Sequence, residues 1–377
     1  MKSNIANDWM QHTPTNGTRK LGFNITLIGV CFLLLTCAPA LMAQYLPGAL
    51  QVVSTVPSNG DVNPYGVAFV PPNFPGGVLN PGDVLVSNFN NNMNLQGTGT
   101  TIVRVTPQAA ASVFFTSQPN QQGLSTALAI LQEGLVIVGN FPSADGTCGT
   151  AGPGGLLVIN SSGQQVQTIT DDTFIDGPWD MAVYDFGGGK VDAFIANGLS
   201  GTVTRLNLAL SGGTFTVQSK TTIASGYGFQ CDPVTFVDAP TGLVYDPQKD
   251  ILYVASTVDN TIFAVSNASQ RNDNGGVGQV IYQDQIHLHG PLAMAAAPNG
   301  DLLVSNNDVI NADPNQPSEI VEFTLAGKFV TQHTMDANFG GSFGLNVSLP
   351  RVSTASSRFA AVDDNQSSLL IWTLPNH

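Results

Sequence analysis

The chain has 377 residues, a formal net charge of -14 and only 10% charged residues, while glycine (40) and proline (23) are abundant. The apolar fraction of 42% is ordinary for a folded chain and excludes general disorder. The glycine and proline content excludes a long helical bundle. The 12 lysines and arginines form no cluster, which excludes a nucleic-acid partner, because phosphate contacts need grouped cations.

The N-terminal segment has the pattern of a secretory signal. Arg19 and Lys20 precede an apolar run over residues 21–36, and small residues follow it. We expect cleavage after Ala43, with Ala40 as the second choice. The alternative is an uncleaved membrane anchor, although the run is shorter than the ~20 residues that a spanning helix needs.

Lipidation at Cys37 is a weaker option, because no glycine or alanine directly precedes this cysteine. We therefore predict a signal peptide over residues 1–43 and a single domain over residues 44–377. This arrangement predicts a secreted or periplasmic protein, which would contact a membrane only if the signal segment stays uncleaved.

A sequence unit recurs six times along the rest of the chain. Each unit has a turn, a short apolar strand, a second strand that ends in a polar residue, and a third strand. The second strands are VLVSN (84–88), VIVGN (136–140), AFIAN (193–197), LYVAS (252–256), LLVSN (302–306) and FAAVD (359–363). Their richness in Val, Ile and Leu between Gly, Asn and Pro turns predicts β-strands, and the repetition predicts a six-bladed β-propeller of four-stranded antiparallel blades. Seven blades is the poorer alternative.

The two ends of the repeated region predict how the ring closes. The sixth unit has only three strands, and an alternating segment over about 48–56 precedes the first unit. We expect this segment to be the outermost strand of the last blade, because that pairing leaves no frayed edge between the first and last blades.

The fourth and fifth units resemble NHL repeats. The resemblance lies in PTGLVYDP (240–247), ILYVA (251–255) and NTIFAV (260–265), and in PNGDLLV (298–304). The chain is thus similar to the NHL-repeat and SMP-30-like six-bladed propellers of the secreted bacterial type. This resemblance implies a fold more than an activity, because such propellers include hydrolases, lyases and binding platforms.

One face of such a propeller carries the loops from second to third strands and the connections between blades, and we call it the long-loop face. These segments are long here, at 89–100, 141–154, 225–239, 283–290 and 307–318. Variable loops on a rigid frame usually carry function. Many aspartates map to this face, which makes bound Ca²⁺ possible, although aspartates are also good turn residues. Cys148 and Cys231 both fall on this face, so a disulfide between them is possible.

The residues at the blade openings give the candidates around the axis. Similar lactonases hold a divalent metal with carboxylates and amides at these positions, but the candidates here include Tyr65, Trp179, Thr241 and Phe343. This composition argues against a metal-dependent lactonase, and no cofactor is predicted. Aromatic rings with nearby amides suit a carbohydrate or peptide, while a plain plug of the channel is the alternative.

A second ring of polar residues lies where the second strands end. Its amides are those of Asn88, Asn140, Asn197 and Asn306. These amides are candidates for ligand binding, and capping of the adjacent turns by hydrogen bonds is the favoured interpretation.

The candidates for catalysis are few. Asp180 lies one residue off the axial column, and His287 and His289 precede the fifth opening. Similar amidating lyases hold zinc with several histidines, and two histidines without a third ligand do not support zinc. The sequence therefore favours a secreted, monomeric, non-catalytic propeller that binds a protein, peptide or carbohydrate on its long-loop face. The alternative is a hydrolase or lyase acting at the axial mouth.

Overall fold

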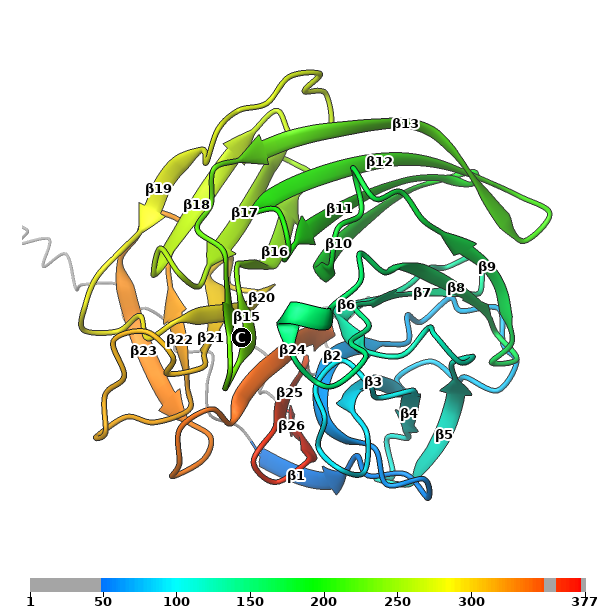
Figure 1. Ribbon diagram of the computed structural model, residues 1–377, viewed down its shortest axis with the longest axis horizontal. Helices are drawn as coiled ribbons and strands as arrows, with labels where there is room; N and C mark the ends of the chain where they lie inside the picture. The colour runs from blue at the N-terminus through cyan, green and yellow to red at the C-terminus, as the bar shows by residue number, and fades with distance from the viewer. Residues whose placement is uncertain (1–48, 349–356, 374–377) are drawn as a thin grey trace, which may run out of the picture. The chain divides into compact units, whose positions relative to one another are not determined.

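The computed structural model describes residues 49–348 and 357–373, and the signal segment expected over residues 1–43 lies outside them. These residues form six four-stranded antiparallel sheets placed around a common centre (Figure 1). The prediction of a six-bladed propeller is confirmed. In the described ranges no helix is long and apolar enough to cross a bilayer.

Each blade runs from an inner strand at the axis to an outer strand at the rim. The first three blades consist of β2 (Val62–Phe69), β3 (Val84–Asn90), β4 (Thr101–Val105) and β5 (Ala111–Thr116); β6 (Leu124–Ile130), β7 (Leu135–Asn140), β8 (Gly155–Asn160) and β9 (Gln165–Ile169); and β10 (Pro178–Gly187), β11 (Lys190–Asn197), β12 (Thr202–Ser211) and β13 (Thr214–Ser225). The third blade has the longest strands, and its outer pair extends well beyond its neighbours in Figure 1.

The last three blades follow the same order, with one exception at the end of the chain. They consist of β16 (Pro240–Asp246), β17 (Ile251–Ser256), β18 (Thr261–Ser266) and β19 (Gln279–Tyr282); β20 (Pro291–Ala296), β21 (Leu302–Asn306), β22 (Glu319–Phe323) and β23 (Phe329–Thr334); and β24 (Ser342–Ser348), β25 (Arg358–Asp363), β26 (Ser368–Thr373) and β1 (Ala49–Ser54).

The ring is closed by the first strand of the chain, as the sequence predicts. Strand β1 pairs antiparallel with β26, with Val53 opposite Leu369. Thr55 extends the contact between the two ends of the chain, because its backbone N–H and its hydroxyl both donate to the carbonyl of Ser367, at 3.0 and 2.8 Å. Val53 is buried and Gln51 on the same side of β1 is half-buried, so packing supports the closure as well as the ladder.

The second strands are buried on both sides, which explains their nearly continuous apolar sequences. Every residue of β3 and of β7 is buried. The core consists of clusters between neighbouring blades, such as that of Leu85, Ile102, Val136 and Leu157 between the first two blades. Each blade therefore depends on the next for burial of its apolar faces.

Two elements fall outside the repeats and were not predicted. A hairpin of β14 (Gln230–Asp232) and β15 (Phe236–Asp238) lies in the connection between the third and fourth blades. A single 3₁₀ turn, η1 (Cys148–Thr150), lies in the loop between β7 and β8. In Figure 1 both elements are drawn over the centre of the ring.

Candidate functional site: an axial pocket opposite the long loops

An aromatic plug fills the axis at the long-loop face. We give this name to six buried rings, which are those of Tyr65, Phe89, Phe141, Trp179, Phe236 and Phe343. Tyr65 stacks between Phe89 and Phe343, with ring centroids 4.6 and 4.5 Å away, and meets Trp179 edge to face at 5.5 Å. Offset stacks and edge-to-face pairs of this kind are the favourable arrangements of aromatic rings. The candidate Tyr65 therefore contacts both of the other aromatic candidates, Trp179 and Phe343, and all three rings are buried.

The hairpin of β14 and β15 covers the plug. Phe236 of β15 enters the plug and packs edge to face on Phe141 at 5.2 Å. Cys231 of β14 is disulfide-bonded to Cys148 of η1, with their Cα atoms 5.5 Å apart. The tip of the hairpin also reaches the first blade, because the Gln96 amide donates to the Val234 carbonyl at 2.8 Å. The axis is thus closed at the long-loop face by segments from several blades.

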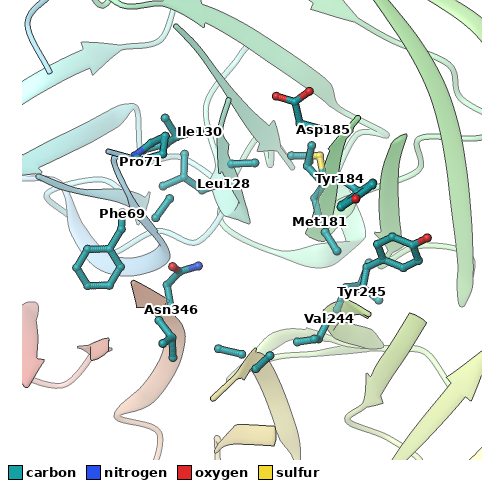
Figure 2. A pocket seen from close by; sticks show the side chains of 18 of the residues that line it. Phe69, Pro71, Leu128, Ile130, Met181, Tyr184, Asp185, Val244, Tyr245 and Asn346 are labelled. Carbon is teal, nitrogen blue, oxygen red and sulfur yellow. The ribbon is translucent and has the colours of Figure 1, made fainter. Parts of the chain in front are cut away.

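The other end of the axis is open. We call this side the short-turn face, because it carries the turns between first and second strands. Here the last residues of all six inner strands surround an axial pocket with a cavity volume of about 530 Å³. Figure 2 shows its wall, where Tyr184 and Tyr245 lie on one side and Phe69 and Asn346 on another. At the long-loop face the aromatic plug and the hairpin occupy the axis, so the axial pocket opens only on the short-turn face of the described ring.

Most of the side chains that line the axial pocket are apolar. Leu128, Met181, Leu243 and Met294 project from four different blades into its lining. The inner strands carry aliphatic residues here because each also packs against the neighbouring blade. A concave, mostly apolar site with a few polar groups is the usual form of a small-molecule pocket.

A smaller cavity of about 60 Å³ lies at the floor of the axial pocket, and we call it the floor cavity. Thr126, Asp180 and Asn346 are the polar side chains that border it. The hydroxyl of Thr126 donates to the carbonyl of Trp179, and one carboxylate oxygen of Asp180 accepts the N–H of Leu243 at 2.9 Å. These bonds join the second blade to the third and the third to the fourth.

Asp180 is the one acidic residue at its position of the repeat, where the other blades have Gly66, Thr126, Gly242, Ala293 and Gly344. At two of these positions the strands approach closely, because a Cβ added to Gly242 or Gly344 would lie 2.2 Å from the Leu292 carbonyl oxygen or 1.6 Å from that of Tyr65. Only glycine fits at those two positions. Asp180 instead places a carboxyl group in this position, between two blades and beside the floor cavity.

The environment of Asp180 disfavours its charged form. Burial raises the pKa of Asp180 from its ordinary value of 3.8 to about 7, although the N–H groups of Met181 and Leu243 act in the opposite direction. Part of the side chain still borders the floor cavity, so a ligand in the axial pocket could reach it. A carboxyl group that titrates near neutrality in a pocket is a candidate for function.

A pair of acids lies at the rim of the axial pocket. Asp185 is at the end of β10 and lines the pocket, and Glu133 is in the turn between β6 and β7. Partial burial and a hydrogen bond to the Asp185 carboxyl raise the pKa of Glu133. The rim therefore adds further acidity to the site.

The remaining axial candidate and the ring of amides are hydrogen-bonded inside the protein. Thr241 is buried, and its hydroxyl donates to the carbonyls of Pro291 and Leu292 at 3.2 and 3.1 Å. The four amides bond mostly to the connections that precede their blades: Asn88 to Thr55, Asn140 to Gln122, Asn197 to Phe174 and Asp176, and Asn306 to His287 and His289. Each amide thus fastens a connection to a second strand, which is the geometry of a turn cap.

The two histidines lie in the connection between β19 and β20, away from Asp180. His287 Nδ1 is 2.7 Å from an oxygen of Asp284, and the imidazole stacks on Phe329 at 3.8 Å. His289 is buried, with Nε2 3.4 Å from an oxygen of Glu319. The structure therefore does not bring the three catalytic candidates together.

Several residues of the site escape prediction from single positions. Phe89 and Phe141 each follow the asparagine that ends a second strand, and this recurrence in the sequence was a usable signal. Phe236 belongs to no repeat, so only the folded hairpin shows that it enters the plug. No group of three or more histidine, cysteine, aspartate or glutamate side chains able to hold a metal ion occurs within 49–348 and 357–373.

The architecture defines a six-bladed propeller with its axis closed at one face and hollow at the other. Comparison with known proteins supports this class, although no family model matches the chain and no curated protein does. Among solved structures, virginiamycin B lyase from Staphylococcus aureus is 12% identical with a TM-score of 0.50, over 87% of this chain and 100% of that one. Regucalcin from Agrobacterium tumefaciens, a calcium-binding protein, is 12% identical with a TM-score of 0.51, over 88% and 96%.

A third similar structure, of a protein inferred to be a gluconolactonase, is 11% identical with a TM-score of 0.54, over 87% and 94% of the two chains. The chain therefore has the propeller fold that is shared by the SMP-30/gluconolactonase and regucalcin families. At these identities the likeness concerns the fold alone. The similar structures include both enzymes and a calcium-binding protein.

Proposed function

We propose that this protein binds a small, mainly apolar molecule in the axial pocket at its short-turn face. The observation that carries the proposal is the pocket itself, about 530 Å³ and lined by all six inner strands. Its volume is in the range of pockets that bury drug-sized molecules. Because its walls are β-strands packed in a closed ring, the site is pre-formed, and a rigid site loses little free energy to ordering when it binds.

The geometry also supports the choice of face. Contacts at the long-loop end of the axis would have to displace the aromatic plug, which is held by ring packing and by the disulfide of Cys148 and Cys231. The axial pocket requires no such displacement. Binding of a protein, peptide or carbohydrate by the outer long loops stays a prediction from the sequence, as does secretion.

A fragment library screened by ligand-observed NMR tests this proposal. Asn346→Trp puts a large side chain into the axial pocket, and Asn315→Trp, in the exposed loop before β22, is the matched control. We expect fragments that bind the wild type to lose binding in Asn346→Trp and to keep it in Asn315→Trp. Fragments that bind both variants equally would place binding elsewhere and refute the proposal.

A second function is favoured by one observation. A carboxyl group with a pKa of about 7 is suited to general acid or base catalysis at neutral pH, because both of its forms are populated there. Asp180 could serve a hydrolase or lyase in this way. A screen of small esters and lactones with the wild type and with Asp180→Asn distinguishes this function from binding alone. Turnover by the wild type that is lost in Asp180→Asn would establish catalysis.

A further inference from the structure

We propose that the ligand of the axial pocket carries a protonated amine, which enters the floor cavity and pairs with the carboxylate of Asp180. This inference rests on the proposed function and assigns the ligand class. The charges around the site supply the first argument. The residues that line the axial pocket and the floor cavity include Asp180 and Asp185, and among the described ones there is no lysine, arginine or histidine.

A basic group beside the wall of the axial pocket is engaged elsewhere. The Arg358 guanidinium lies over the Phe69 ring, 5.3 Å from its centroid, and donates to the Gly82 carbonyl at 2.7 Å. Burial also lowers the pKa of Arg358, with the nearby charge of Asp83 opposing that change. No cation of the described chain is bonded to Asp180, which accepts hydrogen bonds from backbone N–H groups.

Asp180 is half-buried, and a carboxylate withdrawn from water without a counter-charge is costly, so a cation that pairs with it offsets the cost. An ammonium group can do so because it has three N–H donors. The floor cavity offers matching acceptors, namely the Asp180 carboxylate, the Asn346 amide oxygen and the Thr126 hydroxyl. At about 60 Å³ this cavity has room for an ammonium group but not for a ring, so the rest of the ligand occupies the wider pocket above.

The wall above the floor cavity suits the apolar part of an amine. Tyr184 and Tyr245 pack edge to face with their centroids 5.5 Å apart, and Figure 2 shows them on the same side of the pocket. Met181 and Met294 add flexible thioether side chains to the lining. Aromatic faces attract cations as well as apolar groups, whereas they offer nothing specific to an anion.

The wider field of the molecule favours the same ligand class. Asp185 and Glu133 place two carboxyl groups together at the rim, and the whole chain has a net charge of -14. A negative rim concentrates cations at the entrance and repels carboxylates or phosphates. The acidic groups at the floor cavity, at the rim of the axial pocket and on the protein surface therefore all favour a positively charged ligand.

Three probes of similar size and different charge separate this inference from the proposed function. Isothermal titration calorimetry at pH 8 would use 2-phenylethylamine, 2-phenylethanol and 3-phenylpropionate with wild type, Asp180→Asn and, as a control, Asp172→Asn. Asp172 is exposed on the long-loop face. We expect the amine to bind the wild type about tenfold or more tighter than the alcohol, which corresponds to one charge-assisted hydrogen bond, and the acid not to bind.

In Asp180→Asn the preference for the amine should disappear, while Asp172→Asn should behave as the wild type. Amine binding should also release protons near pH 7, which appears as a dependence of the heat on the buffer. Equal binding of amine and alcohol, unchanged by Asp180→Asn but abolished by Asn346→Trp, would overturn the amine inference and leave the pocket proposal standing. Probe binding that survives Asn346→Trp would overturn both.

Discussion

Replacement of Asp180 by asparagine should stabilise the protein at alkaline pH. The carboxyl group lies between the third and fourth blades, where one of its oxygens accepts the Leu243 N–H at 2.9 Å. Asparagine has nearly the same shape and keeps an oxygen for that bond. The variant therefore removes the charge and leaves the packing of the blades unchanged.

The magnitude follows from the pKa of Asp180, which burial raises from 3.8 to about 7. Below pH 4 the side chain is protonated in both the folded and the unfolded protein, so it does not affect stability. As the pH rises from about 4 to about 7 the unfolded state loses its proton first, and the folded state becomes less stable. Above pH 7 the loss is complete and amounts to about 4 kcal/mol, or nearer 2 kcal/mol where water enters the floor cavity.

Urea unfolding of wild type and Asp180→Asn at pH 4 and pH 8 measures this effect. We expect similar midpoints at pH 4 and a higher midpoint for the variant at pH 8, with unchanged slopes. Asp172→Asn, which changes an exposed acid, should match the wild type at both values. A variant that is less stable than the wild type at pH 8 would contradict the reasoning, because it would show that the charged form of Asp180 stabilises the fold.

Three further predictions concern the rest of the domain. Replacement of Cys148 and Cys231 by serine, or reduction, should cost about 4 kcal/mol of unfolding free energy and lower Tm, because the bond closes a loop with a sequence separation of 83; an unchanged Tm under reducing conditions would count against it. Val53→Asp should lower the free energy of unfolding in urea by roughly 3 kcal/mol or more, because it puts a charge into the buried side of the ring closure. Val52→Asp, on the exposed side of β1, should lower it little. Equal effects of the two variants would argue against the closure. Glu319→Gln should be more thermally stable than the wild type, and this gain should be larger at pH 9 than at pH 5. Burial, and then the charge of Asp308, raise the pKa of Glu319 to about 8, so its proton is retained to higher pH in the folded state than in the unfolded one. A gain confined to acidic pH would refute this.

The architecture could be predicted because each blade repeats the same local code. Short apolar strands, their turns and the unpaired segment that became β1 were all visible in the sequence, and they define six blades and the closure. The positions of Cys148 and Cys231 on one face followed from the same register. Local patterning and topology agree in these regions, so the sequence suffices.

The open end of the axis could not be predicted from the repeats. Which face is closed depends on Phe236, which comes from a connection outside the repeats, and on Phe89 and Phe141, which lie just past the second strands. Asp180 was singled out only because it stands beside the axial column. Its raised pKa depends on the neighbouring blade, and no sequence spacing encodes the distance between blades.

The central claim is that the axial pocket at the short-turn face is the binding site. A crystal structure of the protein soaked with 2-phenylethylamine at pH 8 tests this claim most directly. We expect density for the amine in the axial pocket, with its nitrogen within hydrogen-bond distance of Asp180 and its ring near Tyr184 and Tyr245. Density for the amine among the long loops, with the axial pocket holding only water, would contradict the account.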